Sequence, residues 1–178
     1  MRRTSMSLAC LFVAMLSAVA VQAQMPVAKP APELSKLDYF AGDWSTDTDM
    51  KPGPMGPGGK ITSTGDAHWM DGKFFLVMHS KFKSAMGDGV SLAVMGFDPE
   101  KKVYTYNDFD SMGQAGRAVG TVDGDTWTFT SDENFGGQAF KGRYTMKIIS
   151  PTSYTFKYEM SKDGTEWTTM MDGKATKK

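Results

Sequence analysis

The sequence of 178 residues contains a single cysteine, Cys10, which lies in an apolar stretch near the N-terminus. A lipid-anchoring cysteine would follow such a stretch instead of lying inside it. If this stretch is removed on maturation, the remaining chain has no thiol, which excludes a disulfide, a cysteine metal site and a cysteine nucleophile. After residue 23 there is no apolar run long enough to cross a bilayer and no basic stripe. A membrane span and a nucleic-acid surface are therefore not expected.

The first 23 residues have the pattern of a secretory signal peptide. Arg2 and Arg3 precede the apolar run Leu8–Val21, and Val21-Gln22-Ala23 fits the small-x-small cleavage rule. The sequence therefore predicts a signal peptide over residues 1–23 and export to the periplasm or the extracellular space. The paired arginines leave twin-arginine export open beside the general route. Removing these two arginines from the 20 basic residues leaves 18 against 20 acidic ones, a net charge of −2.

The rest of the chain, about 155 residues, has the size of one domain. Residues 24–32 hold three prolines and no hydrophobic period, which predicts a flexible lead-in to a domain over residues 33–178. Leu34, Leu37 and Phe40 recur at helical spacing. We therefore expect a short helix from Glu33 to Phe40 that stops at Gly42.

After Gly42 the hydrophobic period changes to two, which is the period of a β-strand. Five Asp-Gly dipeptides interrupt the pattern, and Asp-Gly between alternating runs is typical of tight hairpins. Many short strands without an intervening helix predict an all-β antiparallel meander, as a sandwich or a barrel. Lys51–Gly59 and Asp132–Gln138 are expected to be loops. The ten expected strands are Trp44–Met50, Lys60–Met70, Lys73–Lys83, Gly89–Phe97, Val103–Phe109, Gly116–Val122, Asp125–Ser131, Phe140–Ile149, Tyr154–Lys162 and Thr165–Lys174.

If Asp71-Gly72 is a two-residue hairpin loop, the register of its two strands follows. Trp69 pairs with Phe74 on the core face, and His68 and His79 fall on the outer face. The two imidazole rings would then start about 13 Å apart at ~3.3 Å per residue. We therefore expect surface histidines that do not share a metal ion.

Two further Asp-Gly turns give the same kind of register. Asp123-Gly124 pairs Gly120 with Trp127, and Asp163-Gly164 pairs Met160 with Trp167 and Tyr158 with Thr169. In each hairpin a large side chain tends to face a small one, as on the concave side of a curved sheet.

Gly42-Asp43-Trp44, which follows the short helix, resembles the Gly-x-Trp start of the calycins, the group of lipocalins and fatty-acid-binding proteins. Met95–Pro99, Tyr104 and Asp108–Gly113 resemble a bacterial family known as domain of unknown function 1579. The resemblance runs from Leu34 to the C-terminus. It implies a calycin-like barrel of about ten strands, with the short helix capping one end and the tryptophan plugging it. It implies no catalytic residues, and it leaves open the roles of Asp110–Gly113 and of the Lys51–Gly59 loop.

The sequence offers little catalytic chemistry. Asp108 and Asp110 share one face of a strand and could do acid–base work, but a solvated strand end explains them better. Ser111 has no histidine near it, so no Ser-His-acid set is expected. Of the twelve methionines after residue 23, those at strand spacing, such as Met78 and Met146, fit core packing better than copper(I) binding. We therefore predict no catalytic, cofactor-binding or metal-binding residues.

A ten-stranded barrel is wider than the eight-stranded kind that side chains fill, which allows a cavity. The predicted function is the binding of a small, mostly apolar ligand by an exported barrel. An enzyme of cyclase or isomerase type inside the same barrel is an alternative, which would need inward titratable residues with shifted pKa values. A structural barrel with a filled core is a second alternative. The predicted lining is Trp69, Phe74, Met78, Asn107, Trp127, Phe129, Tyr144, Phe156 and Tyr158, with Thr169 as a further polar group.

Overall fold

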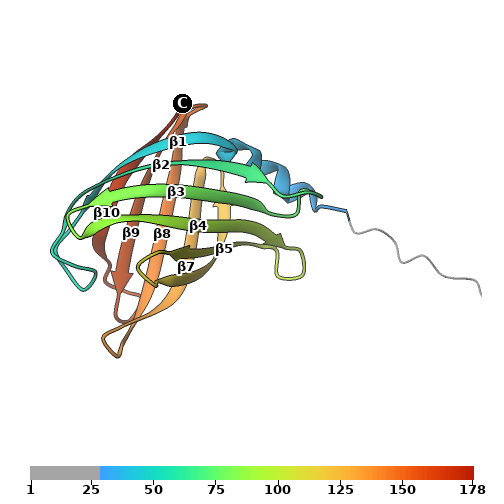
Figure 1. The fold of residues 1–178 in the computed structure, drawn as a ribbon. Helices are drawn as coiled ribbons and strands as arrows, with labels where there is room; N and C mark the ends of the chain where they lie inside the picture. Colours follow the sequence, from blue (N-terminus) through green and yellow to red (C-terminus); the bar gives the residue numbers. More distant parts are fainter. Residues whose placement is uncertain (1–28) are drawn as a thin grey trace, which may run out of the picture.

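The computed structural model describes residues 29–178, so the predicted signal peptide and Cys10 lie outside the described residues. Ten antiparallel strands in chain order close into one barrel, in which β1 pairs with both β2 and β10 (Figure 1). The predicted antiparallel meander barrel is confirmed, as a barrel and not a sandwich. The strands are β1 (Gly42–Met50), β2 (Gly59–Trp69), β3 (Leu76–Ser84), β4 (Gly87–Asp98), β5 (Val103–Asp110), β6 (Ala115–Asp123), β7 (Thr126–Phe135), β8 (Gln138–Ser150), β9 (Ser153–Ser161) and β10 (Thr168–Lys177).

A 3₁₀ helix, η1 (Pro32–Phe40), closes one end of the barrel, as predicted. A 3₁₀ helix has three residues per turn, so Leu34, Leu37 and Phe40 point in one direction, and all three are buried. In Figure 1 the helix lies where β1 begins, away from the loop that joins β1 to β2. Among the described residues no helix has the length and apolar character needed to cross a membrane.

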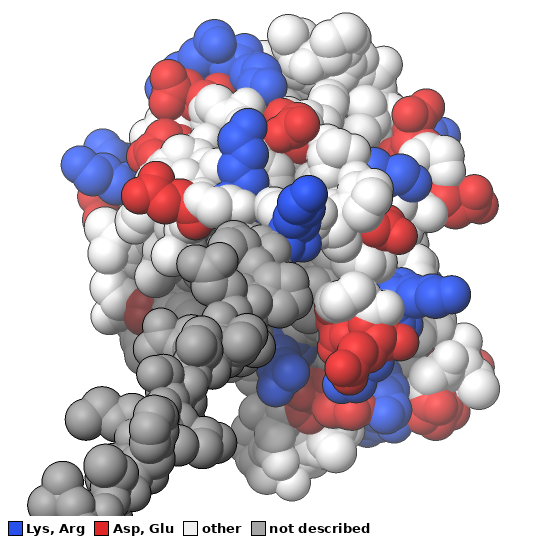
Figure 2. Space-filling view, turned by 90° about the vertical axis from the view of Figure 1, so that its right-hand side faces the viewer, with Lys and Arg blue, Asp and Glu red and all other residues white. Residues whose placement is uncertain are grey.

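The charged side chains on the outside of the barrel are mixed in sign. On the face drawn in Figure 2, basic and acidic side chains of the described residues alternate, with uncharged surface between them. The basic side chains that this view shows therefore do not merge into one extended basic area.

The hydrophobic core lies beneath the η1 helix. The ring of Trp127 lies 4.7 Å from that of Tyr104 and 5.3 Å from that of Phe40, both in edge-on contact. Trp44 of the Gly-x-Trp segment is buried beside them, and its indole Nε1 donates to the Phe40 carbonyl at 2.8 Å. The largest fully buried side chains are Trp127, Phe129, Leu37, Leu76 and Met95.

The hairpin between β2 and β3 is wider than the sequence predicted. The Met70 N–H donates to the Phe75 carbonyl, so the loop spans four residues, and Gly72 and Lys73 both have positive φ. The pairing is therefore shifted by two residues: Trp69 pairs with Leu76 and not with Phe74. A shift of two keeps each side chain on its face, so the faces were right and the partners wrong.

The other two hairpins also differ from the predicted register. Asp123 pairs with Thr126, so Gly124-Asp125 is the loop and Gly120 pairs with Phe129 instead of Trp127. This is again a shift of two residues, so the predicted inward and outward faces of the two strands are correct.

At Asp163-Gly164 the shift is a single residue, because Thr168 pairs with Met160 and a bulge lies between Thr169 and Met171. Trp167 and Thr169, predicted to face inward, therefore lie on the outer side. There the Trp167 ring stacks on the Arg143 guanidinium at 4.0 Å. Beyond the bulge Met171 pairs with Tyr158, and the faces return to the predicted assignment.

The Gly-rich segment Asp132–Gln138, predicted as a loop, is mostly strand. β7 runs to Phe135 and β8 starts at Gln138, so only Gly136 and Gly137 form the turn. Both glycines have positive φ, as a type I′ hairpin requires. The pairing of β7 with β8 therefore continues to Phe135. Glu133 and Phe135 point into the barrel at the end opposite η1.

Candidate functional site

The end of the barrel opposite η1 is hollow. A cavity of about 620 Å³ opens there, lined by inward side chains of the strands β5 to β10 and by Met55 of the β1–β2 loop. A second pocket of about 220 Å³ lies deeper in the barrel and shares Tyr106 and Tyr144 with the first. These two pockets do not support the alternative of a structural barrel with a filled core. The side chains that give the outer cavity its chemistry are Tyr106, Asp108, Phe129, Glu133, Tyr144 and Tyr158.

Two glycines make room for the polar groups of this cavity. Asp108 of β5 pairs with Gly116 of β6, and a Cβ on Gly116 would collide with Asp108 Oδ1. On β8, a Cβ on Gly142 would collide with Ser131 Oγ and come within 2.8 Å of the Tyr158 hydroxyl. The missing side chains let a carboxylate and a hydroxyl lie over the sheet, where they face the cavity.

Two carboxylates, Asp108 and Glu133, line the cavity, and Arg117 is a basic residue of the same lining. Burial raises the pKa of Asp108, and the negative charges of Glu133 and Asp110 raise it further. Glu133 accepts a hydrogen bond from Ser131 Oγ at 2.6 Å. Burial also raises the pKa values of Tyr106, Tyr144 and Tyr158, so these phenols stay neutral and can donate hydrogen bonds. The site can accept hydrogen bonds from a ligand, attract a cation, or exchange a proton at Asp108.

The structure brings together five of the nine residues predicted to line the barrel. Phe129, Tyr144 and Tyr158 line the outer cavity. Met78 and Phe156 line the deeper pocket, together with Tyr144. Whether any of them binds a ligand stays a prediction.

The other four lie elsewhere. Trp127 is buried beneath η1, and Trp69 reaches that helix, where its indole Nε1 donates to Asp38 at 2.8 Å. Phe74 lies in the widened β2–β3 loop. Asn107 was wrongly expected inside: it lies between the inward Tyr106 and Asp108 on β5, and alternation turns it to the outer face.

Sequence reasoning missed two residues of the cavity and misjudged a third. Glu133 was assigned to a loop, although the odd-numbered positions Trp127, Phe129 and Ser131 lead to it at strand spacing. Tyr106 was overlooked although Tyr104 and Asp108 flank it at the same spacing. Asp108 was expected to be solvated, whereas it is partly buried in the cavity.

The segment Asp110–Gly113 forms the turn between β5 and β6. Asp110 Oδ1 accepts hydrogen bonds from the N–H groups of Met112 and Gln114 at 2.8 and 3.0 Å. The Val90 N–H donates to Ser111 Oγ at 3.0 Å, which ties the turn to β4. These contacts make the segment a structural turn beside the open end.

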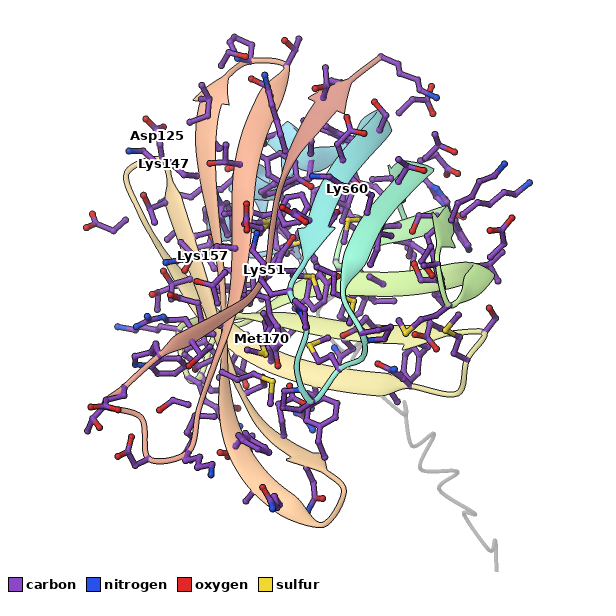
Figure 3. The ribbon with its side chains drawn as sticks, turned by 90° about the vertical axis from the view of Figure 1, so that its left-hand side faces the viewer. Lys51, Lys60, Asp125, Lys147, Lys157 and Met170 are labelled. Carbon is purple, nitrogen blue, oxygen red and sulfur yellow. The ribbon has the colours of Figure 1, made fainter. Side chains whose placement is uncertain are left out.

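The Lys51–Gly59 loop also lies at the open end, where Met55 reaches the cavity. Its first residue is fixed to β10, because the Lys51 N–H donates to the Met170 carbonyl at 2.8 Å (Figure 3). The Lys51 ammonium bridges Asp49 and Asp172 at 3.0 and 2.9 Å. The loop is thus anchored at its start and borders the cavity further along.

Comparison with known sequences identifies the family. The model of the family described as "Protein of unknown function (DUF1579)" matches residues 29–177. The chain belongs to this family. No curated protein matches the chain.

Solved structures share the fold of this family member at low identity. The crystal structure of Rv2717c from M. tuberculosis has a TM-score of 0.59 at 15% identity, over 84% of this chain and 99% of that one. An S-type phycobiliprotein lyase, CPES from Guillardia theta, has a TM-score of 0.48 at 11% identity, over 80% and 89% of the chains. A de novo designed fluorescence-activating β-barrel has a TM-score of 0.46 at 15% identity, over 79% and 95%. Only the first likeness supports an argument, and it concerns the barrel fold alone.

Proposed function

We propose that this barrel binds a small, mostly apolar ligand through its open end, with a cationic or hydrogen-bond-donating group of the ligand facing Asp108 and Glu133. The observation that carries the proposal is the cavity of about 620 Å³, whose aromatic walls surround two carboxylates. Apolar walls with a few convergent polar groups are typical of small-molecule sites. The aromatic rings supply contact area, and the carboxylates orient the ligand.

The deeper pocket extends the site toward a more polar wall. On the inner side of β1 to β4 the hydroxyls of Thr46 and Ser63 are 2.6 Å apart, and those of Ser80 and Ser91 are 2.7 Å apart. Phe156 and Tyr144 line the same pocket from β9 and β8. A ligand that reaches this depth would meet rings on one side and hydroxyls on the other.

A neighbouring pair of residues provides a matched test. Ala118 of β6 lines the cavity, whereas Val119 is 40% exposed on the outer face. Residues 24–178 are purified and examined by native mass spectrometry and by titration with cationic and neutral lipophilic dyes. Ala118→Trp fills the cavity and should weaken dye binding at least tenfold, while Val119→Trp leaves it unchanged. Binding that Ala118→Trp does not weaken, or no uptake of any dye and no co-purified species, contradicts the proposal.

We also propose that the protein is exported, on the basis of the pattern in residues 1–23. The full chain produced in a Gram-negative host should appear in the periplasm or the medium with Gln24 as its first residue, as intact-mass measurement would show. A chain started at Met25 serves as the control and should stay in the cytoplasm. A full chain that stays there uncleaved contradicts the proposal.

One observation favours a catalytic role as a second candidate. Asp108 and Glu133 line the same cavity, and the raised pKa of Asp108 suits a group that gives or takes a proton. An acid–base enzyme would keep ligand binding but lose turnover in Asp108→Asn. A binding protein would change only in its affinity for the ligand and its pH dependence.

A further inference from the structure

The two histidines of the chain lie side by side on the outer face of the barrel. The rings of His68 on β2 and His79 on β3 are 5.6 Å apart between centroids and nearly parallel, with 9° between their planes. The sequence-based distance of about 13 Å is wrong, because the β2–β3 register is shifted by two residues. The shift brings together two imidazoles that the expected register kept apart.

A carboxylate completes the group. Asp66 pairs directly with His79 across the two strands and lies two residues before His68 on the same face of β2. Asp66 Oδ2 lies 3.1 Å from His68 Nδ1. One potential ligand atom from each of the three residues lies within 4.8 Å of the others.

The surrounding charges are mixed, with one feature that favours a cation. Asp43 of β1 pairs directly with Asp66, and two carboxylates facing each other across strands repel. Lys81 lies two residues after His79 on the same face, and Lys178 follows the end of β10, with its N–H bonded to the Asp43 carbonyl at 2.9 Å. A bound cation would relieve the repulsion between the carboxylates, and the lysines would moderate its affinity.

We propose that Asp66, His68 and His79 bind one divalent transition-metal ion, with zinc(II) as the ion to test. Two imidazoles and a carboxylate are a common ligand set for zinc, with a water in the fourth position. In a tetrahedral site with bonds of about 2.0–2.1 Å, the ligand atoms lie about 3.4 Å apart. The side chains of His68 and Asp66 are 56% and 55% exposed, so they can rotate to close the remaining gap.

The first test is calorimetric titration of residues 24–178 with zinc, using protein without a histidine tag. We expect one ion per chain. His68→Ala and His79→Ala should each weaken binding at least tenfold, and Asp66→Asn should weaken it severalfold. Asp47→Asn, which removes an equal charge from the outer face of β1, should change affinity less than twofold. Absence of zinc binding, or binding that persists when both histidines are replaced, overturns the proposal.

A second measurement does not depend on any variant. The chain has only two histidines, so its imidazole nitrogen signals report on this site alone. One equivalent of zinc should shift the ¹⁵N resonances of both rings together. Shifts of only one ring, or of neither, overturn the proposal.

The variants of the first test should not change the stability of the fold. Because the three side chains are exposed, the variants should keep the thermal midpoint of the zinc-free protein.

Discussion

The two ends of this barrel are built from the same strands, but the side chains that these strands direct inward differ between the ends. At the closed end, Leu37 of η1, Trp127 of β7 and Tyr104 of β5 are at most 4% exposed. At the open end, the same strands carry Glu133 on β7 and Asp108 on β5, and Gly116 and Gly142 take the place of side chains. One end is packed with rings, and the other holds a cavity with two carboxylates.

The difference indicates that the two ends of the barrel have different roles, one in stability and the other in binding. Free energy of folding comes mainly from buried apolar area, which is concentrated at the closed end. Partly buried carboxylates such as Asp108 contribute little or oppose folding, so their presence at the open end fits a role in binding. We therefore expect substitutions to affect stability at one end and ligand binding at the other.

The largest effect should come from a pair of tryptophans, one at each end. Trp127→Ala removes a fully buried ring and should lower the free energy of unfolding by about 3–5 kcal/mol. Trp167→Ala at the open end removes a ring that lies outside the barrel on Arg143, and should cost about 1 kcal/mol or less. Denaturant unfolding of both variants measures the contrast. Equal losses would show that the closed end does not dominate stability.

A smaller effect is expected from the ion pairs that support the open end from outside. Glu159 is 6% exposed and contacts Arg143 Nη2 at 2.8 Å and Lys157 Nζ at 2.7 Å. Glu159→Gln should therefore cost about 1.5–3 kcal/mol. Asp132→Asn, which breaks the exposed pair with Lys141, is the control and should cost less than about 1 kcal/mol. Denaturant midpoints for the two variants measure the difference, and equal costs would contradict it.

The Glu159 cluster also predicts a pH dependence. Burial alone would raise the pKa of Glu159, but the hydrogen bonds from Lys157 and Arg143 outweigh it and lower the pKa. The unfolded chain then holds this proton more tightly, so the contribution is present above about pH 4.5 and is lost as the pH falls below it. Glu159→Gln should remove this part of the acid sensitivity, which thermal unfolding between about pH 3 and 7 would reveal.

Alternation and turn residues act locally, so the sequence predicted an antiparallel meander, and the family resemblance implied that it closes into a barrel. The spacing of Leu34, Leu37 and Phe40 predicted the short helix for the same reason, and the resemblance implied that this helix caps the barrel. The sequence also predicted which residues face inward in two of the three hairpins. Both registers were shifted by two residues, but such a shift leaves the alternation of faces unchanged. The bulge after Thr169 on β10 has no sequence signal that we can identify, and it moved Trp167 and Thr169 to the outer face.

The candidate sites could be predicted only in part, because they depend on partners across strands. The inward side of Tyr144 and Tyr158 follows from alternation within a strand. The meeting of Asp108 with Glu133 depends on how β7 continues past Ser131, and the meeting of His68 with His79 depends on the length of one loop. A change of two residues in the β2–β3 register is enough to turn two distant surface histidines into a potential metal site.

The smallest effect, and the one with the opposite sign, should come from Asp108→Asn at the open end. Because the pKa of Asp108 is raised in the folded protein, the folded state binds this proton more tightly than the unfolded state. The aspartate therefore favours folding at low pH, and that contribution is lost as the pH rises from about 3.8 through the raised value. Asp108→Asn should match or exceed the parent stability at pH 7, by no more than about 0.5 kcal/mol, and lose this advantage near pH 4. Asp110→Asn, which alters a turn residue outside the cavity, should not show the reversal. Denaturant unfolding at both pH values tests this, and a clear loss of stability at pH 7 for Asp108→Asn would mean that the carboxylate supports the fold instead of the binding site.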